Sequence, residues 1–182
     1  MRHVAPAPAE AIDAGPAVLR RWRPDDLDAS CAAVFASLEH LRPWMPWALD
    51  FSRAAQAEFL VGSGRDWDAR AGFNYAIVTG GAIAGSAGLM ARIGPGGLEI
   101  GYWVHPGYTG HGVATGAAGA LTAAALALTG VDHVEIHHDE LNLASERVPA
   151  KLGYTHVETR PQTRFARAPG DSGVSKVWRL TS

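Results

Sequence analysis

The feature that most constrains the fold is a strand that leads through a glycine turn into a long apolar helix. Residues 98–104 are almost continuously apolar or aromatic, which is typical of a strand in the centre of a sheet. The turn HPGYTGHG follows, and the helix is expected at about residues 112–129. A helix N-terminus has unpaired N–H groups and favours negative charge, so the glycines predict an anion site at residues 110–114. A tight turn without a ligand is the alternative.

The rest of the chain mixes strands and helices around this unit. Apolar periodicity and turn signals such as the Gly-Gly pair after residue 79 divide it into short segments. Strands are expected at residues 18–23, 73–79, 82–93, 131–137, 154–160 and 174–180, and helices at 27–39, 52–70 and 143–152. This order predicts an α/β or α+β fold with a mixed sheet.

Length and charge narrow the class of protein. The 182 residues fit one domain, which we place at residues 17–182, after an Ala- and Pro-rich segment 1–16 that we expect to be a flexible leader. Sixteen basic and eighteen acidic residues give a net charge of −2, which argues against DNA binding. The sequence has no apolar run typical of a membrane span or signal peptide. We therefore expect a cytoplasmic monomer or homodimer.

Three kinds of anion site are considered for the glycine turn. A P-loop ends in Gly-Lys-Ser/Thr, and GHGVAT has no lysine, so this kind is excluded. A Rossmann fingerprint requires a third glycine where Thr115 stands. Asp132, twenty residues after Gly112, gives that kind only weak support. The third kind is a site for coenzyme A.

Four segments carry a resemblance to a known family: LRRWRPDDL at 19–27, LRPWMPWA at 41–48, EIGYWVHPGYTGHGVAT at 99–115 and NLASERVPAKLGY at 142–154. The chain resembles the GCN5-related N-acetyltransferase (GNAT) superfamily, and more closely its RimJ/RimL-like, ribosomal-protein-type branch. The resemblance implies a mixed, largely antiparallel sheet, flanked by helices and splayed between its fourth and fifth strands. It also implies that the pantetheine arm of acetyl-CoA enters this gap, with the pyrophosphate on the turn before the long helix.

The resemblance assigns the cofactor to the central strand, to the turn with the start of the long helix, and to the following helix. The residues so assigned are Trp103, Val104, Thr109, Gly110, His111, Gly112, Val113, Ala114, Thr115, Asn142 and Lys151. Two positions depart from the family pattern. Thr109 stands where a long side chain is usual, and Pro149 is expected to interrupt the last helix and to free a carbonyl near Ser145.

The implied reaction is the attack of an amine on a thioester. It requires a base, because an alkylamine is mostly protonated at pH 7. Glu99, at the start of the central strand, is the predicted base, with Glu135 in reserve; a solvent-exposed role at the strand edge is the alternative for Glu99. The N–H of Val104 is the predicted donor to the oxyanion. Ser145 resembles the serine that serves the leaving thiolate, with helix capping as its alternative role. Tyr154 is the substitute acid in the wider superfamily, with packing in the core as its alternative role.

The Pro-rich loop at residues 41–51 is the predicted wall of the acceptor site. Trp44 and Trp47 are rigid aromatic residues in an irregular segment, although a hydrophobic plug beneath the loop is the alternative. Arg42, which flanks the tryptophans, and Glu135 are further candidates for contact with the acceptor.

The histidine-rich strand at residues 131–137 does not predict a metal site. His133 and His137 share one strand face, but at roughly 3.3 Å per residue they lie about 13 Å apart, too far to bind one ion. No cysteine nucleophile is expected either, because the single Cys31 falls on the first helix, away from the proposed chemistry.

These inferences predict an acyl-CoA-dependent N-acetyltransferase that works by direct attack in a ternary complex. Its acceptor would be the primary amine of a protein N-terminus or of a small molecule. A non-catalytic CoA-binding or regulatory module is one alternative, favoured by Thr109 and Pro149. The other is a related acyltransferase with a tRNA-borne donor or acceptor, to which the near-neutral charge gives little support.

Overall fold

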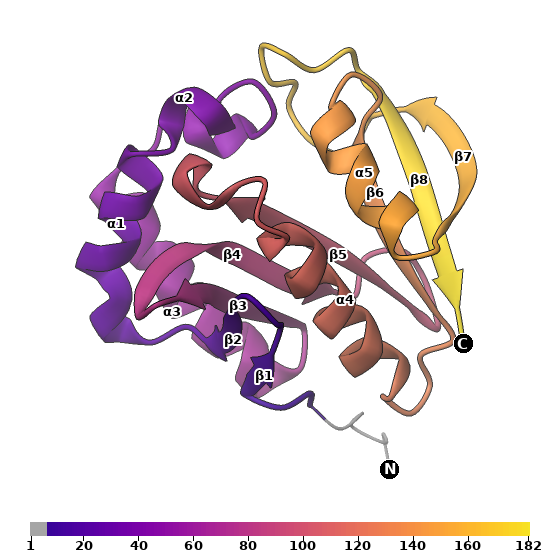
Figure 1. The fold of residues 1–182 in the computed structure, drawn as a ribbon, viewed down its shortest axis with the longest axis horizontal. Helices are drawn as coiled ribbons and strands as arrows, with labels where there is room; N and C mark the ends of the chain where they lie inside the picture. Colours follow the sequence, from indigo (N-terminus) through magenta and orange to yellow (C-terminus); the bar gives the residue numbers. More distant parts are fainter. Residues whose placement is uncertain (1–6) are drawn as a thin grey trace.

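One mixed sheet organises residues 7–182, the part of the chain that this computed structural model describes. Its eight strands lie in the order β1-β2-β3-β4-β5-β6-β8-β7 (Figure 1). Neighbouring strands are antiparallel except β5 and β6, which are parallel. The strands are β1 (Ala11–Asp13), β2 (Val18–Arg21), β3 (Gly72–Thr79), β4 (Ala82–Met90), β5 (Gly97–Val104), β6 (His133–Asp139), β7 (Thr155–Pro161) and β8 (Val174–Thr181).

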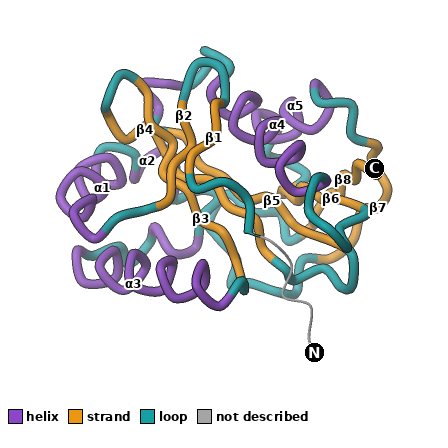
Figure 2. Tube along the Cα trace, turned by 90° about the horizontal axis from the view of Figure 1, so that it is seen from below, coloured by secondary structure: helices purple, strands orange, loops and turns teal. Residues whose placement is uncertain are grey.

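Helices cover both faces of the sheet (Figure 2). The α-helices are α1 (Leu27–Phe35), α2 (Leu38–Leu41), α3 (Arg53–Ala69), α4 (Val113–Leu126) and α5 (Leu143–Lys151). Helices α1 and α3 pack on β4 and β3, whereas α4 packs on β5 from the opposite face and has α5 beside it. The predicted class, a mixed and largely antiparallel sheet flanked by helices, is confirmed. No helix within residues 7–182 combines the length and the apolar character that crossing a membrane would need.

Local chemistry explains several element boundaries. The hydroxyl of Ser52 accepts the N–H of Ala55 at 3.1 Å and caps the start of α3. Gly80 and Gly81 turn the chain between β3 and β4 with φ angles of 57° and 82°, which glycine adopts without strain. The helix predicted at residues 27–39 is divided into α1 and α2, because Ser37, with φ of −106° and ψ of −2°, departs from helical backbone angles.

The expectation that residues 1–16 form a flexible leader is wrong for residues 7–16. Residues 1–6 lie outside the described residues. Strand β1 forms there and pairs with β2. The hydroxyl of Tyr75 donates to the carbonyl of Ala9 at 2.8 Å, and a Cβ on Gly116 would come within 2.3 Å of the carbonyl oxygen of Ala14. These contacts are made by the main chain and do not require apolar side chains at regular spacing. The hydrophobic pattern therefore does not predict that this segment is ordered. The prediction of a single domain at 17–182 stays a prediction.

The two parallel strands separate part of the way along their length. Residues 97–100 of β5 pair with 133–136 of β6, and beyond Ile100 no pairing with β6 continues, although β5 runs on to Val104. Because the N–H of His105 bonds to the carbonyl of Ala84, alternation along the antiparallel β4–β5 pair turns the N–H of Val104 away from β4, toward the gap. Counted from β2, these are the fourth and fifth strands, so the predicted splay is confirmed.

Candidate active site

The turn before α4 presents main-chain amides to a ligand. Gly110 and Gly112 have φ angles of 77° and 78°, a left-handed conformation that favours glycine, and the space where a Cβ would lie is open at both. No side chain caps α4, and within the described residues no hydrogen bond occupies the amides of residues 113–115. The first turn of α4 therefore has the unpaired donors and the dipole that the predicted anion site requires.

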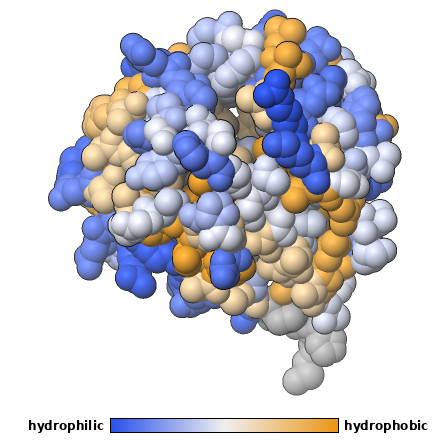
Figure 3. All heavy atoms as spheres, in the orientation of Figure 1, coloured by the Kyte–Doolittle hydropathy of each residue, from blue (hydrophilic) through white to orange (hydrophobic). Residues whose placement is uncertain are grey.

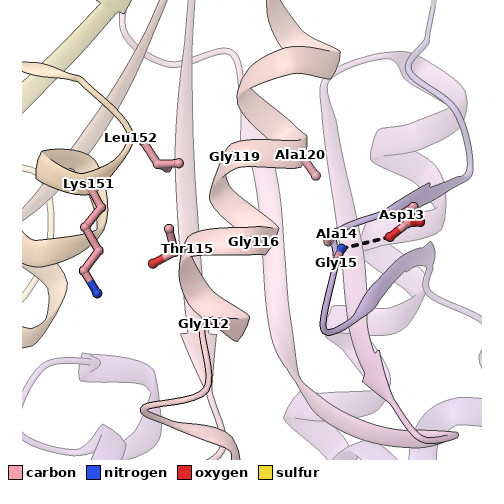
Figure 4. A pocket seen from close by; sticks show the side chains of 10 residues that line it. All are labelled: Asp13, Ala14, Gly15, Gly112, Thr115, Gly116, Gly119, Ala120, Lys151 and Leu152. Atoms are coloured by element: carbon pink, nitrogen blue, oxygen red, sulfur yellow. Dashed lines mark hydrogen bonds between the residues drawn. The ribbon is translucent and has the colours of Figure 1, made fainter.

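A shallow hollow of about 540 Å³ lies beside this end of α4 (Figure 4). Small residues of α4 form its floor, with the end of α5 on one side and the turn between β1 and β2 on the other. It is lined by Asp13, Ala14, Gly15, Gly112, Thr115, Gly116, Gly119, Ala120, Lys151 and Leu152. The structure thus gathers three residues that were predicted for the cofactor, Gly112, Thr115 and Lys151. Lys151 brings an ammonium group and Thr115 a hydroxyl, both of which suit a phosphate.

A larger cavity of about 940 Å³ opens where β5 and β6 separate. The space-filling view shows a hollow in the surface between α2 and α5 (Figure 3). The cavity is lined by residues that the sequence predicts for catalysis, for the cofactor and for the acceptor: Glu99, Ser145, Trp103, Asn142, Trp44 and Trp47. Residues far apart in the chain therefore share one site.

The cavity reaches both faces of the sheet. Successive side chains of a strand point to opposite faces, so Glu99 and Trp103 lie on one face of β5, and Tyr102 and Val104 lie on the other. Trp103 packs against the small hydrophobic cluster formed with α1 and α3. Val104 and Tyr102 pack with the core around α4, and Tyr102 contacts Ser145 of α5. The opening between β5 and β6 connects these two sets of residues.

Glu99 is buried, with 4% of its surface exposed, and two guanidinium groups hold it. Arg92 donates to Oε1 at 2.5 Å, and Arg164, from the segment between β7 and β8, donates to Oε2. Nδ1 of His137 lies 3.7 Å from Oε2. Burial alone would raise the pKa of Glu99, but the Arg92 hydrogen bond, the neighbouring positive charges and the Arg164 hydrogen bond hold it below its usual range. Glu99 is thus an ionised, buried carboxylate rather than a solvent-exposed one.

Glu135 is the neighbour of Glu99 across the parallel strand pair and is just as buried. Arg179, opposite on β8, donates from Nε to Oε1 at 2.8 Å, and Nε2 of His137 lies 2.6 Å from Oε2. Burial would raise the pKa of Glu135, but the hydrogen bonds of His137 and Arg179 hold it below its usual range. His137 lies between the two carboxylates. Glu99 and His137 line the cavity, whereas Glu135 supports His137 from beside it.

Ser145 is held near the start of α5. Oδ1 of Asn142 caps the helix by accepting the N–H of Ser145 at 3.2 Å. The hydroxyl of Tyr102 lies 3.0 Å from the hydroxyl of Ser145 and donates to its carbonyl at 3.3 Å. The expectation that Pro149 interrupts this helix is wrong. Helix α5 continues from Leu143 to Lys151 with Pro149 buried inside it, and the freed carbonyl has Tyr102 as its partner.

The Pro-rich loop supplies an aromatic wall. Trp44 and Trp47 line the cavity, and the rings of Trp47 and Trp103 lie 6.3 Å apart. Trp47 is 43% exposed, so it is not a plug beneath the loop. Arg42 is not brought to the cavity: it is exposed, and its Nε donates to the carbonyl of Ala48 at 3.4 Å.

The remaining predicted residues lie in the turn or in the core. The hydroxyl of Thr109 donates to the carbonyl of Pro106 at 2.8 Å, and Nδ1 of His111 lies 2.8 Å from the carbonyl of Thr109, so both side chains stabilise the turn. Val113, the first residue of α4, is buried, and Ala114 is half-buried. Tyr154 is also buried, with its hydroxyl 2.6 Å from that of Thr122, and it does not line the cavity that contains Ser145.

Sequence reasoning missed four residues of the larger cavity that lie against Glu99 or Ser145: Arg92, Tyr102, His137 and Arg164. Tyr102 lies in the segment EIGYWV, and strand alternation places it on the face opposite Glu99. His137 was considered only as a metal ligand. Arg92 and Arg164 are 7 and 65 residues from Glu99 in sequence, and no pattern links them to it. Across residues 7–182, no three or more His, Cys, Asp or Glu side chains are grouped so as to hold a metal ion.

Comparisons with known proteins agree with this geometry. Residues 17–155 match the family described as "Acetyltransferase (GNAT) domain". No curated protein matches the chain. The microcin C7 self-immunity acetyltransferase MccE, solved with acetyl-CoA and AMP, is a similar structure at 15% identity and a TM-score of 0.86, with 95% of this chain and 97% of that one covered.

Two further solved structures are also similar. RimJ of Mycobacterium smegmatis, in complex with CoA-disulfide, has 21% identity and a TM-score of 0.81, with 94% of this chain and 84% of that one covered. The Salmonella typhimurium acetyltransferase that modifies the N-terminal serine of ribosomal protein L7/L12 has 18% identity and a TM-score of 0.83, with 95% and 99% covered. At these identities the likeness concerns the fold.

Proposed function

Because the chain belongs to the acetyltransferase (GNAT) domain family, we propose that it transfers the acetyl group of acetyl-CoA to a primary amine, which attacks directly in a ternary complex. The observation that supports this best is the gap between β5 and β6. The start of α4, which no side chain caps, lies on one side of the sheet, and the buried carboxylate of Glu99 faces the cavity on the other. Acetyl-CoA, when bound, supplies an activated thioester. Residues of this chain would bind the two substrates, stabilise the developing charge and move the protons.

The cofactor-side residues suit a diphosphate followed by a narrow arm. The main-chain amides of residues 110–115 would hold the pyrophosphate, because they are unobstructed and lie at the positive end of the α4 dipole. Backbone donors also explain why Thr109 can replace a long side chain. Lys151 and Thr115, in the adjoining hollow, would bind a further phosphate. Asn142, at the start of α5, would contact the arm, and Trp103 would meet the thioester end of the arm from the acceptor face.

The N–H of Val104 would stabilise the charge that develops on the carbonyl oxygen. It points into the gap and belongs to a strand fixed by β4, so it needs little reorganisation during the reaction. The hydroxyl of Ser145, on the cofactor face, would donate to the leaving thiolate. These two donors approach the reacting centre from β5 and from α5.

The acceptor would enter from the opposite face, past Trp44 and Trp47. Its ammonium group must lose a proton before the nitrogen attacks. Glu99 lies five residues before Val104 on β5, or about 16 Å along the strand, so we propose that a chain of waters in the cavity carries this proton. Glu99 and His137 are the groups at the cavity wall that would receive it, and Glu135 would orient His137.

The acceptor itself is proposed as the primary amine of a protein N-terminus or of a small molecule. A ribosomal-protein N-terminus is the acceptor of the similar Salmonella enzyme. AMP is bound in the similar MccE structure, and the aromatic wall here would also accommodate a flat ring. The volume of about 940 Å³ is large enough for either an extended peptide end or a small molecule.

The decisive experiment follows free-thiol release from acetyl-CoA in the presence of an amine panel. The panel should contain peptides with free and blocked N-termini and small amines with flat rings. Calorimetry with CoA runs in parallel. We expect CoA binding and acceptor-dependent thiol release, with acetylated product detected by mass spectrometry. Binding of CoA without turnover on any amine would favour a non-catalytic module instead, and no binding of CoA would reject the proposal.

A further inference from the structure

Helix α5 contains a residue that removes one of its own hydrogen bonds. Pro149 has no N–H, so the carbonyl four residues earlier, that of Ser145, has no partner within the helix. Such a carbonyl usually turns to water or bends the helix. Here the helix continues to Lys151, and the partner comes from β5: the hydroxyl of Tyr102 donates to the Ser145 carbonyl at 3.3 Å.

The same tyrosine oxygen also meets the side chain of Ser145, at 3.0 Å from its hydroxyl. A tyrosine hydroxyl has one proton, and a carbonyl can only accept. With the Tyr102 proton on the carbonyl, the serine hydroxyl donates to the oxygen of Tyr102 in the resting site, and it would turn from that oxygen to donate to a leaving thiolate. Burial raises the pKa of Tyr102 to about 12, so its hydroxyl keeps this proton at neutral pH.

Three atoms of Ser145 are therefore held by two side chains. Asn142 accepts its N–H at 3.2 Å, and Tyr102 contacts both its carbonyl and its hydroxyl. A serine inside a helix commonly bonds back to the carbonyl four residues earlier, which would turn its hydroxyl along the helix. The contact with Tyr102 instead directs the hydroxyl toward β5, where the strands separate.

We infer that Tyr102 is a positioning residue for Ser145: its hydroxyl takes the place of the helix bond that Pro149 removes, and the same oxygen holds the serine Oγ beside the gap, from where its proton can turn to the thiolate. The inference rests on the proposed function in so far as Ser145 serves the leaving thiolate. The pairing of a proline with a tyrosine from another element is a property of this chain's own residues, and it predicts that positions 102 and 149 are coupled.

The first test is a double-mutant cycle on stability, which does not depend on catalysis. Tyr102→Phe removes the hydroxyl, and Pro149→Ala restores the N–H that can bond to the Ser145 carbonyl. We expect Tyr102→Phe to lower the folding equilibrium constant about 3- to 10-fold in the wild-type background and clearly less in the Pro149→Ala background. Urea denaturation measures all four variants. Additive effects would overturn the inference.

A matched control uses another buried tyrosine. The hydroxyl of Tyr75 also donates to a backbone carbonyl, that of Ala9 at 2.8 Å, but Tyr75 lies on β3, two strands away from β5, and does not contact Ser145. Tyr75→Phe should cost a similar amount of stability and show no coupling to Pro149→Ala. Equal coupling for both tyrosines would mean that Pro149→Ala loosens the whole protein, and it would overturn the specific role of Tyr102.

The second test is kinetic and uses Ser145→Ala, which keeps the Pro149 helix intact. If Tyr102 acts through the serine hydroxyl, Tyr102→Phe should lower kcat about 3- to 10-fold with little change in the KM for acetyl-CoA, and should have no further effect on kcat in the Ser145→Ala background. An undiminished effect in that background would overturn the positioning role. If the wild type shows no turnover at all, the proposed function fails, whereas the stability cycle still decides the contact.

Discussion

Glu99 and Glu135 are two carboxylates in register on neighbouring strands, both buried and both paired with arginine and His137. They differ in what else they face. Glu99 lines the cavity, whereas Glu135 supports His137. This difference, rather than burial or charge, is what separates a candidate base from a residue that orients one.

Replacing each of these carboxylates by its amide tests the assignment. Glu99→Gln should lower kcat by about 10²- to 10⁴-fold with little change in CoA affinity, because an amide cannot take a proton. Glu135→Gln should lower kcat less, since it disturbs only the orientation of His137. Thiol-release kinetics and calorimetry with CoA give both quantities. Full turnover in Glu99→Gln would remove that residue from the mechanism, and a larger loss in Glu135→Gln would transfer the role to it.

The low pKa values of the same two carboxylates predict that the free energy of unfolding falls at acid pH. Their pKa values are lower in the folded state, so the unfolded chain binds more protons at acid pH. Their stabilising contribution is complete above the unfolded pKa of about 4.3 and is lost as the pH falls through the folded pKa. Urea unfolding from pH 7 downward should show this loss beginning near pH 5, and the loss should be smaller in Glu99→Gln, which starts from a lower stability. An identical pH dependence in that variant would contradict the prediction.

At the scale of single residues, part of the candidate site can be predicted from the sequence. Glu99, Ser145, Trp44 and Trp47 are identified from motifs and do share one cavity. Arg164 is not identifiable, because its contact with Glu99 depends on how the segment between β7 and β8 lies over the sheet. Ion pairs between distant residues follow from the tertiary fold, and periodicity carries no information about them.

Among the elements, the long regular ones are predictable and the short ones are not. Helix α4 and strand β5 lie within a few residues of their predicted bounds, because long apolar runs specify them. Strand β1 has only three residues, and main-chain pairing with β2 holds it in the sheet. The division between α1 and α2 is also decided by a local turn rather than by hydrophobic pattern.

The start of α4 carries its own prediction. Gly112→Asp should weaken CoA binding at least 10-fold, because a carboxylate would stand at the amides that the diphosphate needs. Gly130→Asp is the matched control: Gly130 also has a positive φ, of 87°, and open space, but it lies beyond the other end of α4. Calorimetry with CoA compares the two. Equal losses would show that backbone strain, rather than the anion site, is responsible.

At the scale of the whole molecule, the proposed function brings donor and acceptor from opposite sides of one sheet, which predicts the kinetic mechanism. Both substrates can be bound together, so double-reciprocal plots should intersect rather than run parallel. Cys31 is buried on α1 and is outside the cavity, so Cys31→Ser should retain turnover. Initial velocities at several concentrations of acetyl-CoA and acceptor provide the measurement. Parallel lines would indicate a covalent acyl-enzyme and would contradict direct attack.

Strand β1 has a practical consequence for anyone who trims the gene. A version that starts at residue 17 would lose one rim of the hollow beside α4, formed by Asp13–Gly15. It would also leave the outer edge of β2 unpaired, and the Tyr75 hydroxyl would lose its hydrogen bond to the carbonyl of Ala9. Gly116 would lose its contact with Ala14. An uncovered strand edge invites edge-to-edge aggregation. Expression plasmids for this chain should therefore retain the residues before Val18.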